Sequence, residues 1–360
     1  MQMITLQREH PATDQIRFLH VITTVIDAPR KSVTEPFPIR GVMLSFKKLN
    51  MRDAMNFSRR QVIKGASWAG LSLALPPMAW AQSTLEMGTI RLDTLSDGNL
   101  VLPKTFSLGE TPPDGAEAIL KSYGITGDTF TPDCNVTLLR NGDRTVLFDA
   151  GAGQEFMPSA GKLLDALDAL GVDPSDVTDV AFTHAHPDHL WGVLDDFGDL
   201  IFPDAAYHIG RSEWDYWTDP NTVSTIDQGR VTFAVGAKNR LELLSDQIVF
   251  FDDDQEIMPG VLSRLTPGHT PGHMSFEVQM GSESVMIVGD SIVNHHLAFA
   301  QPTWLSSSDQ NAQLAAETRV ALLDQLSQSQ MRLIGFHLPG GGLGRAERRG
   351  DGYYFVEEQA

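Results

Sequence analysis

The stretch Thr183-His184-Ala185-His186-Pro187-Asp188-His189 places three imidazoles and one carboxylate within six positions, directly after the apolar run Val180-Ala181-Phe182. Side chains two apart in an extended segment point the same way, so the first two histidines can bind one metal ion together. The proline favours the first turn of a helix, because it lacks an N–H and its φ is fixed. That turn directs the next aspartate and histidine towards a second metal. With 11 histidines in 360 residues, a polar loop with incidental histidines is the weaker interpretation.

Three more candidate ligands follow in chain order, each at the end of a predicted strand or in the loop beyond it. His269 lies in the Gly- and Pro-rich turn 266–273. The buried-strand pattern 285–289 leads to Asp290, and the short apolar run Leu333-Ile334-Gly335-Phe336 leads to His337. Function commonly lies on loops that a rigid scaffold holds, so we expect these side chains to meet.

The complete order, His-x-His-x-Asp-His, then Gly-His, then Asp, then His, resembles the metallo-β-lactamase superfamily of binuclear metallohydrolases over roughly residues 88–356. The resemblance implies an α/β fold, an αββα sandwich of two mixed β-sheets flanked by helices. It implies that three imidazoles hold one metal, that two imidazoles and a carboxylate hold a second, and that one aspartate bridges both. In that order the ligands are His184, His186 and His269, then Asp188, His189 and His337, with Asp290 as the bridge.

Imidazole and carboxylate ligands suit two divalent metal ions, with Zn2+ first and Mn2+, Fe2+ or Co2+ as alternatives. A hydroxide shared by two such cations is available near neutral pH and can attack a carbonyl carbon or a phosphorus, so the expected reaction is hydrolysis. We expect Asp290 to act in catalysis as the bridge, and Asp188 also to relay a proton to the leaving oxygen.

Several neighbours of these ligands have roles that the resemblance suggests. The family position favours His269 as the ligand over His273, which then lies beside the site without binding metal. Asp149 stands where the family keeps an acid that orients a ligand histidine through its other ring nitrogen. A turn-capping aspartate is the alternative. His295 and His296 follow the bridging acid closely and are interpreted as pocket wall or as a solvated turn.

The C-terminal run 336–339, with Gly352-Tyr353-Tyr354-Phe355, looks closest to the methyl parathion hydrolase-like and lactonase branch. The expected function is a periplasmic zinc hydrolase that cleaves a neutral ester, lactone or phosphotriester. The alternative is a dedicated N-acyl-homoserine lactonase (quorum quenching), although this chain has Val293 where those lactonases keep a tyrosine. The bridging acid argues against a true β-lactamase, and the absence of an obvious basic patch argues against glyoxalase II.

Aromatic residues outside the ligand motifs are candidates for the wall of a pocket that takes an uncharged substrate. Ordinary core packing is the alternative for each of them. The candidates are Phe106, Trp214, Trp217, Phe299 and Trp304.

The first part of the chain has the features of an export signal. Residues 58–65 are basic, residues 66–75 are mildly apolar, and Ala79-Trp80-Ala81 is a small-residue cleavage site. The pair Arg59-Arg60 resembles a twin-arginine signal, so we expect the twin-arginine translocase to deliver the protein to the periplasm. The apolar run is too short for a membrane span of ~20 residues. The predicted division is a non-native or disordered extension (1–54), a signal peptide (55–81) and a hydrolase domain (82–360).

Charge limits the classes of partner. Residues 1–81 hold 11 of the 27 basic and 5 of the 46 acidic residues, so residues 82–360 carry a balance of −25. Nucleic acid and anionic membranes are therefore unfavourable partners, and a small neutral molecule is expected. The sequence leaves a monomer and a homodimer open. Cys134 is the one cysteine, which excludes an intrachain disulfide, and it opens an apolar run typical of the core.

Periodicity predicts several elements. Residues 138–149 read as a hairpin with a turn at Asn141-Gly142, and residues 161–171 as a helix with an apolar stripe. Helical spacing also extends over 303–327, whereas 213–240 is compatible with a loop or a helix over the site. The residues of the first stripe are Leu163, Leu164, Leu167 and Leu170.

Overall fold

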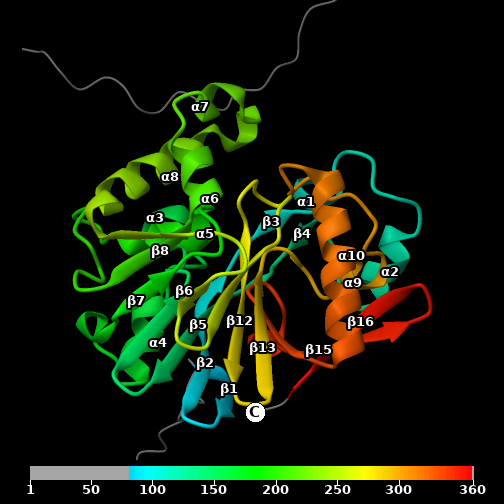
Figure 1. The fold of residues 1–360 in the computed structure, drawn as a ribbon. Coiled ribbons are helices and arrows are strands. Elements are labelled where there is room, and N and C mark those ends of the chain that lie inside the picture. The colour runs from blue at the N-terminus through cyan, green and yellow to red at the C-terminus, as the bar shows by residue number, and fades with distance from the viewer. Residues whose placement is uncertain (1–80, 359–360) are drawn as a thin grey trace, which may run out of the picture. The chain divides into compact units, whose positions relative to one another are not determined.

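The computed structural model describes residues 81–358 (Figure 1). The predicted extension (1–54) and, apart from Ala81, the predicted signal peptide (55–81) lie outside the described residues and stay predictions. No helix in the range 81–358 is both long enough and apolar enough to cross a bilayer.

Two seven-stranded mixed sheets form the centre of the described structure. In the first, β1, β2, β5 and β6 pair antiparallel, and β6, β7, β8 and β9 pair parallel. Its bounds are β1 (Ala81–Met87), β2 (Ile90–Asn99), β5 (Asp133–Asn141), β6 (Arg144–Phe148), β7 (Asp179–Ala181), β8 (Ala206–Gly210) and β9 (Ile248–Phe251).

The second sheet follows the chain order from β10 to β16, with β13 and β14 parallel and its other neighbouring pairs antiparallel. A short pair, β3 (Leu102–Pro103) and β4 (Thr129–Phe130), stands apart from both sheets. The second sheet's bounds are β10 (Glu256–Met258), β11 (Val261–Leu265), β12 (Met274–Met280), β13 (Glu283–Gly289), β14 (Arg332–Gly335), β15 (Leu343–Arg349) and β16 (Gly352–Glu357).

Helices cover the outer faces of both sheets, which confirms the predicted αββα sandwich (Figure 1). Helices α4 and α6 pack on the first sheet, and α9 and α10 pack on the second. The α-helix bounds are α1 (Thr105–Leu108), α2 (Ala116–Ser122), α3 (Gly153–Phe156), α4 (Leu163–Ala169), α5 (Pro187–Leu190), α6 (Arg211–Thr218), α7 (Thr222–Thr225), α8 (Val231–Leu244), α9 (Leu297–Ala300) and α10 (Ala312–Ser329). The 3-10 helices are η1 (Pro174–Asp176), η2 (Trp191–Val193), η3 (Gln228–Arg230), η4 (Ser245–Gln247) and η5 (Gly340–Gly342).

The sheets are buried on both faces, so successive strand residues join different apolar layers. In β6, Val146 and Phe148 face the layer between the sheets, while Leu147 faces the helices. In β13, Ile287 faces that middle layer and Met286 packs in the layer under α10. Three apolar layers therefore hold two rigid sheets, whose strand ends carry the candidate ligands.

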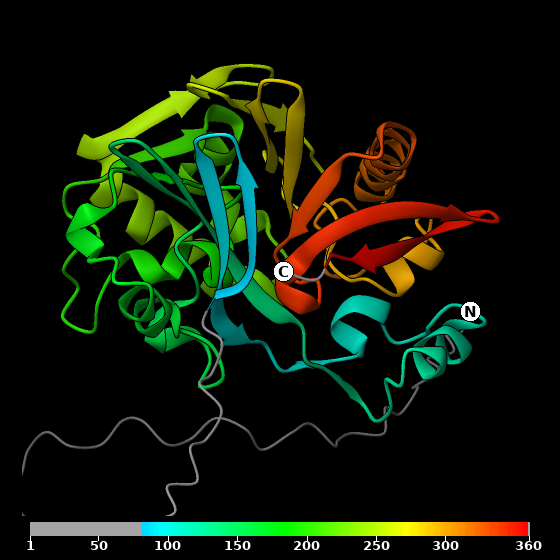
Figure 2. The same ribbon diagram turned by 90° about the horizontal axis from the view of Figure 1, so that it is seen from below.

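Residues 100–132 leave the first sheet between β2 and β5. Figure 2 shows this segment, with α1 and α2, reaching across to the side of the second sheet. There α2 packs against α9. Residues 100–132 therefore place side chains over the strand ends.

Two sequence predictions are correct with adjusted details. The hairpin forms, but its turn is Gly142-Asp143, because Asn141 is still paired with Arg144 and Gly142 takes the positive φ of 60°. The helix predicted over 161–171 is α4, yet Leu164 is 39% exposed and Ala166 is buried in its place. Propensity located both elements, and tertiary packing decided their register.

The other two helical predictions differ at their limits. Helix α10 begins only at Ala312, because the Asn311 side chain accepts a hydrogen bond from the Leu314 N–H and caps the helix there. The unassigned stretch 213–240 is mostly helical, with parts of α6 and α8 and the whole of α7 and η3.

Candidate metal centre

The seven candidate ligands come from strand ends of both sheets. Strand β7 ends at Ala181 and leads to the first motif, whose proline opens α5 with His186 at the N-cap. His269 lies in the loop between β11 and β12. Asp290 directly follows β13, and His337 follows β14, its parallel neighbour.

One group contains imidazole nitrogens alone. His184 Nε2 lies 3.0 Å from His186 Nδ1, which in turn lies 2.9 Å from His269 Nε2. All three rings are buried. These separations are close to the ~3.3 Å between nitrogens around a tetrahedral zinc ion with Zn–N bonds of about 2.0–2.1 Å. The group can hold a metal ion.

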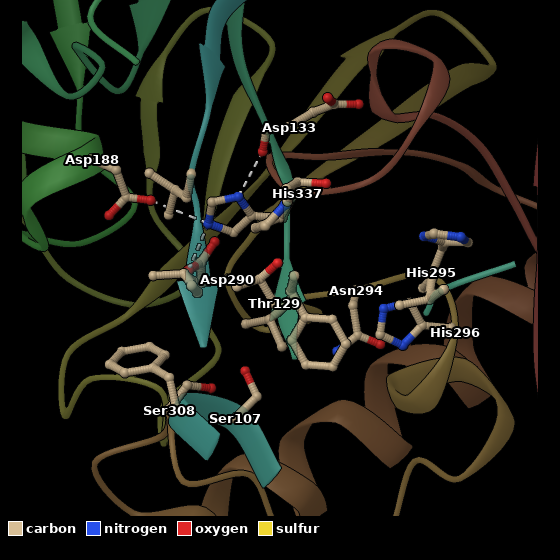
Figure 3. A pocket seen from close by; sticks show the side chains of 18 of the residues that line it. Ser107, Thr129, Asp133, Asp188, Asp290, Asn294, His295, His296, Ser308 and His337 are labelled. Carbon is tan, nitrogen blue, oxygen red and sulfur yellow. Dashed lines mark hydrogen bonds and ion pairs between the residues drawn. The ribbon is translucent and has the colours of Figure 1, made fainter. Parts of the chain in front are cut away.

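A second group combines imidazoles and carboxylates. Asp188 Oδ2 lies 3.4 Å from His189 Nε2 and 3.2 Å from His337 Nε2. Asp290 lies between the two groups, with Oδ1 3.4 Å from His189 Nε2 and Oδ2 3.4 Å from His337 Nε2. The same Oδ2 is 3.3 Å from His269 Nε2 in the first group. Figure 3 shows Asp188, Asp290 and His337 converging at one end of a cavity.

Buried atoms without partners indicate what these groups hold. Asp188 Oδ2, His189 Nε2 and Asp290 Oδ1 are buried and have no hydrogen-bond partner within the described residues. Buried polar atoms normally have partners, because leaving them unpaired costs free energy. Two divalent cations would satisfy all three atoms, so the donor set fits a binuclear site.

Four ligand imidazoles have their other nitrogen fixed by an oxygen acceptor, which for His184 Nδ1 is the Thr183 hydroxyl at 3.0 Å. The Nδ1–H of His189 donates to Asp149 Oδ2 over 2.8 Å, and that of His337 donates to the Asp133 carbonyl over 2.7 Å. His269 Nδ1 donates to Asp309 Oδ1 over 2.9 Å. These bonds leave each Nε2 lone pair free for a metal ion and fix the orientation of the ring.

Asp149 connects β6 to the first motif. It adopts φ 68°, which is uncommon for a residue with a side chain. Its carboxylate accepts from the Thr183 N–H over 2.8 Å and from the Thr183 hydroxyl over 2.9 Å, besides the bond from His189. The carboxylate thus joins the end of β7 to the α5 histidine.

His273 has both ring nitrogens occupied by protein atoms. Nδ1 lies 2.9 Å from the Thr266 hydroxyl, and Nε2 accepts from the Asp290 N–H over 2.9 Å. A side chain at Gly289 would collide with the same Nε2, so glycine allows the ring to approach the backbone. His273 therefore positions the backbone of Asp290 and points no free nitrogen at the two groups.

Glu213 of α6 was missed in the sequence. It is buried, and Oε1 accepts from the Ala185 N–H over 3.0 Å and from Trp217 Nε1 over 2.6 Å. Oε2 accepts from the Thr270 hydroxyl over 2.8 Å and from the Gly272 N–H over 3.0 Å. One carboxylate thus fastens the His184–His186 loop to the His269 loop. No local motif marks this glutamate.

The two groups carry different charge. Burial, and after it the neighbouring imidazoles, lowers the pKa of His184 and His186 well below the ordinary value, so both rings are neutral. Burial also acts on His189 and His337, but the nearby carboxylates outweigh it and raise the pKa of both rings. Despite its burial, Asp188 keeps a lowered pKa because these rings face it. Cations that bind there would displace the protons of the rings.

Cys134 is fully buried in the apolar core, as predicted. Its sulfur also lies within 4.8 Å of ligand atoms of Asp188 and His337. Burial raises the pKa of the Cys134 thiol to about 12. The thiol therefore packs beside the second group in its protonated form.

A cavity of about 460 Å³ opens over the two groups. Residues of both groups form one part of its wall, and apolar and polar side chains share the remainder about equally. The apolar wall residues include Leu100, Leu102, Phe106, Ile125, Phe130, Phe156, Phe233 and Val293.

Of the aromatic candidates for the pocket wall, Phe106 lines this cavity, and Trp304 lines a smaller pocket that shares Ser107, Val293 and Asn294 with it. Trp217 is fully buried and bonded to Glu213, and Trp214 packs edge-on against Phe250. Phe299 and Trp304 belong to the side of α9, packed in the second sheet's outer layer and in a satellite cluster. Aromatic type alone did not show which face each ring occupies.

A guanidinium that the sequence did not indicate also lines the cavity. Arg230, at the end of η3, is mostly buried and donates from Nη2 to the Ser307 carbonyl over 2.6 Å. Burial lowers its pKa, while Asp227 and Asp309 act in the opposite direction. The sequence shows no obvious basic patch, and the fold brings this single guanidinium to the cavity, where Asp227 and Asp309 partly offset its charge.

Comparison with known proteins shows which superfamily the chain belongs to. A model of the metallo-beta-lactamase superfamily matches residues 130–337, and the chain belongs to this superfamily. The N-acyl homoserine lactonase AttM of Agrobacterium fabrum is 30% identical over 149 residues, which cover 40% of this chain and 53% of AttM. The chain thus spans about half the length of that curated relative.

Two solved structures resemble the whole sandwich. AidC, described as a dizinc quorum-quenching lactonase in complex with a product, superposes with a TM-score of 0.72 at 26% identity. The match covers 77% of this chain and 97% of AidC. AbOPH, described as a hydrolase in the beta lactamase superfamily, gives a TM-score of 0.70 at 25% identity and covers 76% of this chain and 96% of AbOPH.

Proposed function

We propose that this member of the metallo-beta-lactamase superfamily is a binuclear, zinc-dependent hydrolase of an uncharged ester, lactone or phosphotriester. The observation that carries the proposal is Asp290, whose carboxylate lies between an all-imidazole group and a mixed group. A partly apolar cavity above them suits an uncharged organic substrate. The dizinc description of AidC supports zinc as the first metal to test.

The position of each candidate ligand indicates which of the two ions it would hold. His184, His186 and His269 would hold one ion, and Asp188, His189 and His337 the other, with Asp290 shared. Two bound divalent ions would lower the pKa of water and polarise the carbonyl or phosphoryl oxygen. Asp188 stands at the cavity wall, where a carboxyl group can pass a proton to the leaving oxygen.

A dedicated N-acyl-homoserine lactonase is the second candidate. AttM and AidC are both described as lactonases, and their similarity favours this narrower activity. Val293 faces the cavity three residues after Asp290 and offers no hydroxyl there. A lactonase of this kind would therefore have to orient its substrate with other groups.

A substrate panel tests both candidates. Zinc- and manganese-loaded protein is assayed with aryl esters, lactones, phosphotriesters, a penicillin and a glutathione thioester. We expect kcat/KM to be higher for the neutral esters and lactones than for the two anionic substrates. Preference for homoserine lactones over every other neutral substrate would favour the second candidate. A penicillin or a glutathione thioester as the best substrate would refute the proposal.

Export to the periplasm is part of the proposal and rests on the sequence of residues 58–81 alone. The twin-arginine translocase reads both guanidinium groups, so Arg59→Lys combined with Arg60→Lys should keep the precursor in the cytoplasm. Cell fractionation measures this. A double variant that still reaches the periplasm would exclude this route.

A further inference from the structure

Part of the cavity wall is formed by polar residues that are not among the candidate metal ligands. Figure 3 shows Asn294, His295 and His296 side by side, away from Asp188, with Thr129 between them and Asp290. All three belong to the loop between β13 and α9, and all three line the cavity. A substrate that reaches the metal centre therefore has room to contact them with its non-reacting part.

The imidazole of His296 presents a donor to this end. Its Nδ1 accepts from the Leu297 N–H over 2.8 Å, so the proton of the neutral ring is on Nε2. Burial, with smaller contributions from His295 and Lys104, lowers the pKa of His296 to about 3, which keeps the ring neutral. Nε2 has no hydrogen-bond partner among the described residues.

Asn294 presents a second donor. Its Oδ1 accepts from the Ala298 N–H in the first turn of α9 over 2.9 Å, next to the N-cap residue His296. The amide Nδ2 is then the group that faces the cavity. It donates to no atom of residues 81–358. Two neutral N–H donors therefore share one end of the cavity.

The surroundings of these donors favour an acceptor over another donor. Phe130 packs against His296 with ring centroids 5.3 Å apart, and Tyr123 packs against His295 at 5.1 Å. Lys104 Nζ lies over the Phe130 ring, 5.9 Å from its centroid, and pairs with the exposed carboxylate of Glu117 over 3.4 Å, which offsets part of its charge. The aromatic rings hold the imidazoles in place, and the ammonium adds positive potential at this end.

We propose that Asn294 and His296 form a donor subsite for an uncharged oxygen acceptor, such as a ketone, amide or ether oxygen, on the non-reacting part of the substrate. The proposal rests on the proposed function, because it describes the other end of the same substrate. It predicts that a correctly placed oxygen strengthens binding without touching the metal centre.

Binding of inert analogues tests the subsite separately from turnover. N-phenyl alkanamides replace phenyl esters, and a ketone is moved carbon by carbon along the acyl chain. Calorimetry on the full, zinc-loaded chain gives the dissociation constant of each ketone and of its methylene partner. We expect the ketone at one chain position to bind roughly five- to tenfold more tightly than its methylene partner. This ratio corresponds to the free energy of one net hydrogen bond.

Variants assign that preference to named atoms. His296→Phe keeps a flat ring but removes the Nε2 donor and the N-cap acceptor of the Leu297 N–H, and Asn294→Asp keeps the acceptor of the Ala298 N–H but removes the amide. Each variant should abolish most of the ketone preference. His296→Gln, which keeps an N–H, should retain part of it. Ser107→Ala, which changes another part of the wall, is the matched control and should leave the preference unchanged.

The outcomes separate the two proposals. Equal affinities for every ketone and its partner in the wild type would overturn the subsite, as would an unchanged preference in both donor variants. If His296→Phe fails to fold, Asn294→Asp decides alone. A ketone preference in a protein that hydrolyses none of the neutral esters, lactones and phosphotriesters of the panel would leave the subsite standing and refute the proposed function.

Discussion

In five histidines at the site, the hydrogen bonds of the ring nitrogens fix the role of the ring. In the ligand rings of His189, His269 and His337, an oxygen acceptor takes Nδ1–H and leaves Nε2 towards the metal positions. In His273 both nitrogens bind protein atoms, so the ring supports the backbone of Asp290. In His296 the backbone takes Nδ1, and Nε2 faces the cavity. The hydrogen bond on one nitrogen thus decides the role of the other.

His296 should make stability depend on pH. Its folded pKa of about 3 lies below the ordinary 6.5, so its contribution is complete above pH 6.5 and is lost as the pH falls towards 3. At pH 5 the loss should be about 2 kcal/mol. Denaturant unfolding at pH 7.5 and pH 5 should show a smaller drop for His296→Phe than for the wild type. Equal drops would contradict a buried neutral imidazole.

At the scale of elements, α6 holds the metal loops together through Glu213. Its carboxylate accepts four hydrogen bonds from two loops and from its own helix. Burial raises the pKa of this carboxyl group, and the four donors oppose the rise. The helix therefore acts as a clamp on both halves of the first group.

Glu213→Gln should destabilise the protein by about 2–4 kcal/mol, because an amide N–H2 would face a backbone donor in a buried position. Zinc affinity should fall with it. Denaturant unfolding and competition with a chelator measure the two effects. The control is Glu242→Gln on α8, whose ion pair with Lys238 lies at the surface and is worth well under ~1 kcal/mol. Indistinguishable results for the two variants would exclude the clamp.

The sequence predicts residues in compact motifs well and residues that only tertiary packing brings to the site poorly. The candidate ligands stand out because they sit in compact motifs at strand ends, and the fold class follows from those motifs. Glu213, Asp309 and Arg230 come from ordinary helical or loop sequence, and only tertiary packing brings them to the site. Trp214 and Trp217 do not line this cavity, because residue type does not fix which way a helix face points.

At the scale of the whole molecule, the net charge and the Arg230 guanidinium affect an anionic substrate at different distances. The balance of −25 over residues 82–360 repels anions at a distance, whereas Arg230 attracts them within the cavity. Salt screens the long-range part, with a Debye length of about 8 Å at physiological ionic strength, and affects the buried guanidinium much less.

Raising the ionic strength should therefore help anionic substrates selectively. For phenyl acetate and the monophenyl ester of succinic acid, kcat/KM is measured from about 0.01 M to about 1 M salt, over which the Debye length falls from ~30 Å to ~3 Å. The value for the anionic ester should rise several-fold, and that for phenyl acetate should stay nearly constant. Parallel responses of the two esters would show that the net charge plays no part in selection.

Metal content is the measurement that tests the two-metal centre most directly. Elemental analysis of the purified, metal-replete wild type should give about two divalent ions per chain, as two ligand groups with a shared carboxylate require. Asp290→Ala should lose more metal than His273→Ala, because one carboxylate faces both groups while His273 contacts only the backbone of Asp290. No more than one tightly held ion in the wild type, or equal losses in the two variants, would contradict the binuclear site.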